Sequence, residues 1–133
     1  MTFSSLEEAR AHFNKDHFAR ESGVVLEELS EGASLCSMAI TEHHLNALGN
    51  VMGGAIFTLA DMSGGAAANS LYFPTVTQQI SMNFLSPCQG KVLYARARCR
   101  RSGRVSCIVN VDVYDELGTD VAQCIFTGYK LPE

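Results

Sequence analysis

The acidic residue Asp61 stands almost alone among uncharged residues. It carries the only full formal charge in residues 43–90, although 18% of the 133-residue chain is charged and about nine charges would be expected there. A buried, unpaired carboxylate costs on the order of several kcal/mol or takes up a proton, so it is usually kept where polar partners or chemistry use it. We therefore predict that Asp61 is a catalytic group. The alternative is a solvent-facing acid on an amphipathic helix.

The glycine pair Gly53-Gly54 stands where a long helix is predicted to begin. A helix start presents unpaired backbone N–H groups and the positive end of the helix dipole, and glycine lets a ligand approach closely. These N–H groups could stabilise an oxyanion. Taken alone, a tight turn from loop to helix is the simpler explanation of the pair.

Asp61 and the glycine pair cannot serve one carbonyl group from the same helix. Asp61 follows Gly53 by eight residues, which at about 1.5 Å per residue places it roughly 12 Å further along the axis. A carbonyl under attack must lie about 3 Å from both the N–H donor and the attacking group. If both groups act in one reaction, one of them comes from a second copy of the chain, related by a two-fold axis.

The remaining sequence predicts one domain, residues 1–133, in which strands surround this helix. Residues 53–71 are apolar and small and end before Pro74, which favours one long helix. A short helix starting at Ser5 is predicted as a lid or packing helix in an N-terminal segment of residues 1–22. Strands are predicted over residues 24–29, 33–41, 75–85, 92–101, 105–115 and 121–130, and a loop over residues 42–52. We expect an α+β fold whose antiparallel sheet of about six strands wraps around the central helix.

Composition narrows the class of protein. The chain is 47% hydrophobic, and its five cysteines form no C-x-x-C pair, which favours reduced core residues in a cytoplasmic protein. Residues 1–10 lack a basic segment followed by an apolar run, so we expect no signal peptide. Prolines and side-chain amides interrupt the charge-poor stretch, which argues against a membrane span. The net charge of -4 argues against nucleic acid as a partner.

The run of residues 44–54 resembles the signature of hotdog-fold acyl-CoA thioesterases of the PaaI-like, phenylacetate-pathway branch. The family pattern is N-x-x-G-x-x-H-G-G followed by an aspartate in the next helix. Here Asn46, Gly49 and Gly53-Gly54 match it, with Asp61 behind them. Residues 77–87 also resemble the family's strand after the central helix, and residues 24–130 follow the family's order of elements.

The resemblance implies a role for each matching residue. Asp61 would activate water or attack the thioester carbon directly, while the backbone N–H of Gly53 polarises the carbonyl. Asn46, from the opposite subunit, would bind near the thioester or the water, and Thr77 would help to hold the water. Such a site needs no metal and no cofactor beyond the coenzyme A of the substrate, because a thiolate leaves readily. The resemblance also implies a homodimer, and a pairing of dimers into tetramers.

One departure from the family pattern concerns Met52, which replaces the histidine before Gly53-Gly54. Methionine cannot donate a hydrogen bond, and loss of one preorganised polar contact can lower a rate by on the order of 10²-fold. Gly54, Met52 and His44 are predicted to line the substrate site. His43 and His44 could replace the missing polar contact, although a lone loop histidine is more often solvated. The alternative to a thioesterase is therefore a non-catalytic acyl-CoA-binding hotdog protein. A hotdog dehydratase would need a histidine-containing segment that is missing.

Basic residues gather in one part of an otherwise acidic chain. Six of the ten lie in residues 91–104, namely Lys91, Arg96, Arg98, Arg100, Arg101 and Arg104. Such a patch would steer polyanionic coenzyme A, with Arg100 and Arg101 as predicted contacts. An outward sheet face or a subunit contact would explain it as well. The acyl group is left open: aromatic residues such as Phe57 and Phe84 could line a small aromatic or short- to medium-chain pocket, although such residues are more often core.

Overall fold

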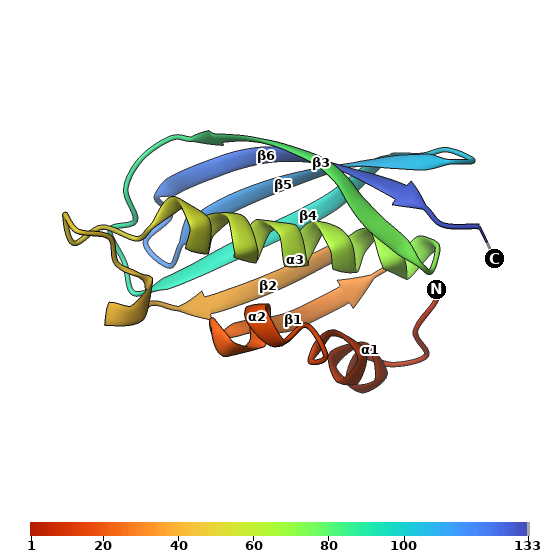
Figure 1. Cartoon of the computed structure of the whole chain (residues 1–133), viewed down its shortest axis with the longest axis horizontal. Helices are drawn as coiled ribbons and strands as arrows, with labels where there is room; N and C mark the ends of the chain where they lie inside the picture. The colour runs from red at the N-terminus through yellow and green to blue at the C-terminus, as the bar shows by residue number, and fades with distance from the viewer. Residues whose placement is uncertain (133) are drawn as a thin grey trace.

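A six-stranded antiparallel sheet wraps around one long helix (Figure 1). The computed structural model describes residues 1–132. Its strands are β1 (Val24–Ser30), β2 (Ala33–Ala39), β3 (Thr75–Phe84), β4 (Val92–Ser102), β5 (Ser106–Asp115) and β6 (Asp120–Lys130). They lie in the order β1-β2-β4-β5-β6-β3, and every neighbouring pair is antiparallel. The predicted fold class is confirmed.

The central helix α3 (Gly53–Leu71) packs into the concave side of this sheet, where small residues let it come close. Gly64 shows why: a side-chain carbon built there would lie 2.7 Å from the ring of Phe126 on β6, far inside contact distance. Alanines at 66, 67 and 68 continue the same surface and are fully or almost fully buried. The small residues in the second half of the helix therefore serve the contact with the sheet.

Alternation along β4 and β5 decides which side chains face the helix. Leu93, Ala95 and Ala97 on β4 are fully buried, whereas Arg96 and Arg98 between them are exposed. On β5, Val109, Val111 and Val113 are buried in the same way. Since successive strand residues point to opposite faces, the arginines lie on the outer face of the sheet.

Buried polar side chains fasten α3 to the sheet. Ser63 donates to the carbonyl of Ala95 on β4 at 2.8 Å, and Ser34 on β2 donates to the carbonyl of Ser63 at 2.6 Å. Further along α3, the side-chain oxygen of Asn69 accepts from the backbone N–H of Thr75 at 2.8 Å, and the side-chain NH₂ of Asn69 donates to the carbonyl of Thr75 at 3.0 Å. These bonds fix the position of α3 along its own axis.

The N-terminal segment forms two short helices rather than the single one predicted. They are α1 (Leu6–Phe13) and α2 (His17–Glu21). The hydroxyl of Ser5 caps α1 by accepting from the backbone N–H of Glu8. Both helices pack against β1, and α2 also contacts α3 (Figure 1).

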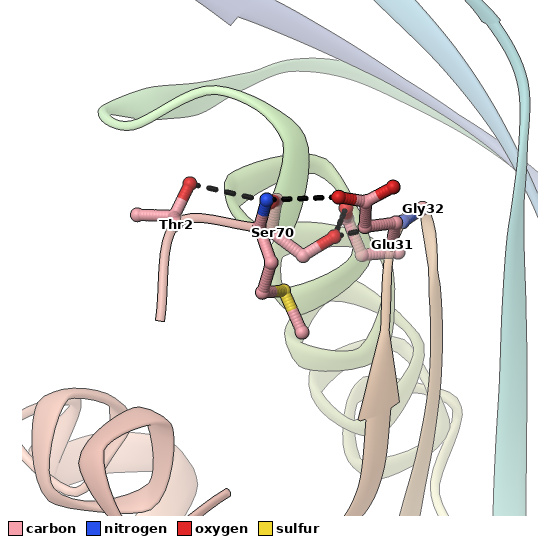
Figure 2. A network of polar contacts seen from close by, with 6 residues as sticks. Thr2, Glu31, Gly32 and Ser70 are labelled. Atoms are coloured by element: carbon pink, nitrogen blue, oxygen red, sulfur yellow. Dashed lines mark hydrogen bonds and ion pairs between the residues drawn. The ribbon is translucent and has the colours of Figure 1, made fainter. Parts of the chain in front are cut away.

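A hydrogen-bonded network holds the start of the chain across the C-terminal end of α3 (Figure 2). The backbone N–H of Thr2 donates to the carbonyl of Ser70 at 2.9 Å, and the Ser70 hydroxyl accepts from the backbone N–H of Gly32 at 2.8 Å. The N-terminal ammonium pairs with Glu31 at 2.9 Å. Thr2 and the β1–β2 turn are thereby joined to the same helix end.

The five cysteines are free thiols. Cys36, Cys107 and Cys124 are buried in the core, and Cys88 and Cys99 are half-buried. Burial raises the pKa of Cys36 to about 12 and that of Cys124 to about 11, so these thiols stay protonated at neutral pH. Across residues 1–132, no helix combines the length and the apolar character that crossing a membrane requires.

Asp115, at the end of β5, is a buried carboxylate that the sequence patterns did not single out. It is 1% exposed and accepts four backbone N–H groups, from Gln89, Gly90, Leu117 and Thr119, at 2.8–3.0 Å. Burial acts to raise its pKa, but these bonds outweigh burial and lower the pKa to about 2. The carboxylate thus joins the loop before β4 to the β5–β6 turn.

Asp115→Asn is expected to lower the free energy of unfolding by about 2 kcal/mol at neutral pH, because the amide NH₂ would face two N–H donors. The folded pKa of about 2 lies below the unfolded value of about 4. The carboxylate therefore stabilises the fold above about pH 4, and this contribution is lost as the pH falls toward 2. Denaturant melts across this range should show the difference from wild type shrinking with acid. The exposed Asp112→Asn is the control, and an equal loss there would contradict the assignment.

Candidate active site

Asp61 and Thr77, predicted together from the sequence, meet in the structure. Asp61 lies in the middle of α3 and Thr77 near the start of β3, and the Thr77 hydroxyl donates to Oδ1 of Asp61 at 2.8 Å. Burial raises the pKa of Asp61, the bond from Thr77 lowers it in part, and the negative charge of Asp16 raises it again. The net effect is a carboxylate that holds a proton more readily than usual, as suits a general base.

Asp61 opens into a cavity of about 490 Å³ between the N-terminal segment and α3. This volume lies within the range of about 300–1,000 Å³ that is typical of small-molecule sites. The cavity is lined by residues 15–19 together with Phe57, Thr58, Asp61 and Met62. The carboxylate is therefore half-buried at the wall of a cavity, and the N-terminal segment forms another wall of that cavity.

The start of α3 offers backbone donors, as predicted. Met52 is the N-cap residue and makes no side-chain cap, and its carbonyl accepts the N–H groups of Ala55 and Ile56. Within residues 1–132, the N–H groups of Gly53 and Gly54 have no acceptor. Gly53 borders a second hollow of about 410 Å³ beside Phe84, and Gly54 borders a smaller one of about 180 Å³. Both N–H groups are therefore available to a ligand oxygen.

Asn46 organises the loop before α3. Its side-chain oxygen accepts the backbone N–H groups of Leu48 at 3.0 Å and Asn50 at 3.1 Å, and Gly49 takes the positive φ of 85° that this turn requires. The Asn46 side-chain NH₂ makes no hydrogen bond in the described part of the chain. Asn46 can thus meet a substrate or water as a donor, whereas its oxygen is already used.

His44 has a different position from the one expected. The structure replaces the predicted loop by a short 3-10 helix, Glu42–His44, and a bridge between Leu45 and Val51. The His44 ring is buried: Nδ1 accepts from the backbone N–H of Thr41 at 3.0 Å, and Nε2 donates to the carbonyl of Ser22 at 2.6 Å. The interpretation of His44 as solvated is wrong, because the ring is buried. The ring does border the hollow that contains Gly54 and Met52, but both of its nitrogens are bound within the fold, so it offers that hollow no free polar atom. His44 instead fastens the end of α2 to this loop.

Met52 and the two arginines lie at opposite ends of α3. Met52 is exposed at the helix start and borders the hollow that contains Gly54 and Phe18. Arg100 and Arg101 lie with Leu71, the last residue of α3, around a hollow of about 390 Å³. Leu71 is ten residues beyond Asp61, or about 15 Å along the axis. One protomer therefore does not bring the arginines to the carboxylate.

The sequence predicted a lid or packing helix in the N-terminal segment but not that this segment lines the Asp61 cavity. Phe18 and Thr58 line both the Asp61 cavity and the smaller hollow at Gly54, so these two spaces adjoin. The apolar side of the first helix pointed to a lid or packing helix, but nothing local to residues 15–19 indicates which part of α3 they cover. The part of α3 that these residues cover is determined by the contact between α2 and α3, which are distant in the sequence.

Comparisons with known proteins place this fold in a family. The profile of the thioesterase superfamily matches residues 48–122. The acyl-coenzyme A thioesterase PaaI of Escherichia coli K12 is 27% identical over 129 residues, which cover 96% of this chain and 91% of the relative. The E. coli PaaI structure superposes with a TM-score of 0.89 at 24% identity, over 95% of this chain and 92% of that one. A hypothetical thioesterase of Streptococcus pneumoniae TIGR4, solved with coenzyme A, gives a TM-score of 0.81 at 29% identity, over 91% and 98%.

The profile covers more than half of the chain and includes Gly53, Asp61 and Thr77, while Asn46 lies just before it. The structural superpositions extend the likeness to nearly the whole fold. The resemblance seen in residues 44–54 is thereby confirmed. This chain belongs to the thioesterase superfamily and is a thioester hydrolase of its hotdog-fold, PaaI-like branch.

Proposed function

We propose that this chain hydrolyses acyl-CoA thioesters with small aromatic or short- to medium-chain acyl groups, at a site that two protomers share. The observation that carries the proposal is the half-buried Asp61 carboxylate, which accepts from Thr77 and opens into a cavity. The S. pneumoniae thioesterase solved with coenzyme A supports a coenzyme A thioester as the substrate class.

The bond between Thr77 and Asp61 suits activation of water. Because the Thr77 hydroxyl spends its only proton on Oδ1 of Asp61, it can only accept from a water beside it. A water held in this way keeps its second proton for Oδ2 of Asp61. The carboxylate takes that proton as the water oxygen attacks the thioester carbon. The C–S bond then breaks, and the coenzyme A thiolate leaves and recovers the proton. Direct attack by Asp61 on the same carbon is the second route.

The oxyanion formed in this step would be bound by the backbone N–H of Gly53 from the other protomer. Gly53 and Asp61 lie on one helix, about 12 Å apart along its axis, so one chain cannot place both at the same carbonyl. The side-chain NH₂ of Asn46, on the loop that leads into Gly53, would add a second donor. These steps need no metal or organic cofactor, because the thiolate is a good leaving group.

The edge of the sheet at β3 is the proposed dimer contact. β3 pairs only with β6, and the exposed apolar residues Val76 (43% exposed), Phe84 (57%) and Phe57 (42%) lie on it or on α3. An open edge with apolar neighbours invites pairing with another strand. A two-fold axis there would bring two copies of α3 together in opposite directions. Further pairing of dimers into tetramers and a cytoplasmic location stay predictions.

The alternative that the sequence leaves open is a chain that binds acyl-CoA but has lost most of the hydrolysis rate. The observation that favours it is Met52, an exposed apolar side chain where a histidine would supply a polar contact. Release of free thiol from a panel of acyl-CoA thioesters, with Asp61→Asn as the control, separates the two functions. Binding without release would support the second, and release that Asp61→Asn leaves unaltered would remove Asp61 from the mechanism.

Arg100 and Arg101 are proposed to hold the nucleotide end of coenzyme A. Both are exposed and make no ion pair within the described residues. Replacing both by alanine should raise KM for an acyl-CoA by on the order of tenfold. The KM for an acyl N-acetylcysteamine thioester, which lacks the nucleotide, should change little. The double variant Arg96→Ala, Arg104→Ala removes the same number of charges outside this hollow and is the control. Equal effects on the two substrates would reject the contact.

A further inference from the structure

Met62 stands between two cavities on the inner side of the N-terminal segment. It follows Asp61 in α3, is 8% exposed, and lines both the cavity that holds Asp61 and a second one of about 380 Å³. No other residue borders both of these spaces in the described chain. Met62 therefore lies where the two spaces come together.

The second cavity is lined by apolar side chains together with a few polar ones. Phe13 of α1 and Val24 and Leu26 of β1 join Met62 in its lining. Arg10 and Arg20 lie at its border, but each already bonds to backbone: Arg10 donates to the carbonyl of Leu26 at 2.7 Å and Arg20 to that of Asn14 at 3.3 Å. The interior thus suits an alkyl or aryl group rather than an anion.

The direction of an acyl group follows from the position of Asp61. A thioester carbon attacked at Asp61 can place its acyl tail in the cavity beside Phe18, Phe57 and Met62, where the tail is removed from water. Burial is favoured by about fourfold in affinity for each methylene removed from water. A tail that lengthens inside this cavity in the direction of β1 reaches the side chain of Met62.

We propose that Met62 sets the length limit of the acyl group, by closing the Asp61 cavity off from the second cavity. This inference rests on the proposed function and adds a residue that decides specificity. Short acyl groups and the shorter medium-chain groups, such as hexanoyl, fit before Met62. A longer group must displace this flexible side chain to enter the space beside Phe13 and Leu26.

The test compares acetyl-, hexanoyl-, decanoyl- and phenylacetyl-CoA with wild type, Met62→Ala and Met62→Leu. Met62→Ala should join the two cavities and raise kcat/KM for decanoyl-CoA relative to hexanoyl-CoA by about fourfold for each methylene that enters. Met62→Leu keeps most of the volume and should keep the wild-type order of substrates. If Met62→Ala is unstable, Met62→Val is used in its place as a milder shortening of the side chain, and Met62→Leu remains the folded variant for comparison.

Leu117→Ala, which removes an exposed apolar side chain from the β5–β6 turn, is the matched control and should leave the order of substrates unchanged. An unchanged order in Met62→Ala and Met62→Val, with hydrolysis still dependent on Asp61, would overturn the inference and leave the proposed function standing. If wild type hydrolyses none of these thioesters, the proposed function fails. Calorimetric affinities for the same series then decide whether Met62 limits acyl length.

Discussion

Asp61→Asn is expected to lower kcat for acyl-CoA hydrolysis by about 10³-fold and to change KM little. The asparagine side chain keeps the shape of the aspartate and can still accept from Thr77, but it cannot take a proton from water or attack the thioester carbon. The melting temperature should stay the same or rise, because a carboxylate that burial makes costly to ionise is removed. Steady-state thiol release and a thermal melt measure both effects.

The control for this variant is Asp112→Asn, which makes the same chemical change on the exposed face of β5. It should leave kcat unchanged. Thiol release by Asp61→Asn within a few-fold of wild type would contradict the assignment of the catalytic base. A fall in activity that accompanies a lower melting temperature would point to a structural role instead.

Gly53→Pro is expected to lower kcat by about 10²- to 10³-fold, because it deletes the backbone N–H that we assign to the oxyanion. Gly53 is the first residue of α3, where proline is well tolerated in a helix. Met52 before it has φ -65° and ψ 140°, a conformation that proline favours in the preceding residue. Gly53→Ala is the matched control, since its side-chain carbon meets the same Phe84 ring at 3.1 Å but the N–H remains.

Mixing the two inactive variants tests whether the site is shared. In a dimer of Asp61→Asn with Gly53→Pro, one site combines the intact aspartate with the intact N–H, and the other site has lost both. Random reassociation should therefore restore about a quarter of the wild-type rate, since half of the dimers are mixed and each has one working site. No recovery in mixtures shown to contain mixed dimers would place both groups in one protomer.

The sequence predicted the elements whose signals are local. Arginines alternate with small residues along residues 92–101, which indicates a strand, and the structure places Ala95 and Ala97 inward and Arg96 and Arg98 outward on β4. The helix from residue 53 to residue 71 has the predicted bounds, because a glycine pair and a proline mark its two ends. The break between α1 and α2 was missed, since residues 14–16 contain neither glycine nor proline.

Contacts between residues far apart in the chain could not be predicted from the sequence. Asp115 resembles an ordinary turn acid beside Gly118, yet two of its donors are the backbone groups of residues 89 and 90. His44 resembles a solvated loop histidine until Ser22 is placed beside it. The pairing of Asp61 with Thr77 was implied by family resemblance alone, because periodicity cannot show which strand lies beside the middle of a helix.

The capless start of α3 bears on how this site tolerates change. The groups that Gly53 and Gly54 present belong to the main chain, and every residue except proline carries the same amide. A substitution at position 52 can thus alter the side-chain chemistry at the N-terminus of α3 and leave the backbone N–H groups of Gly53 and Gly54 in place, provided that the helix still starts at the same residue. Chains that differ in the side chain at this point can therefore share one means of stabilising a negative oxygen, and motif scores that count only side chains will underrate them.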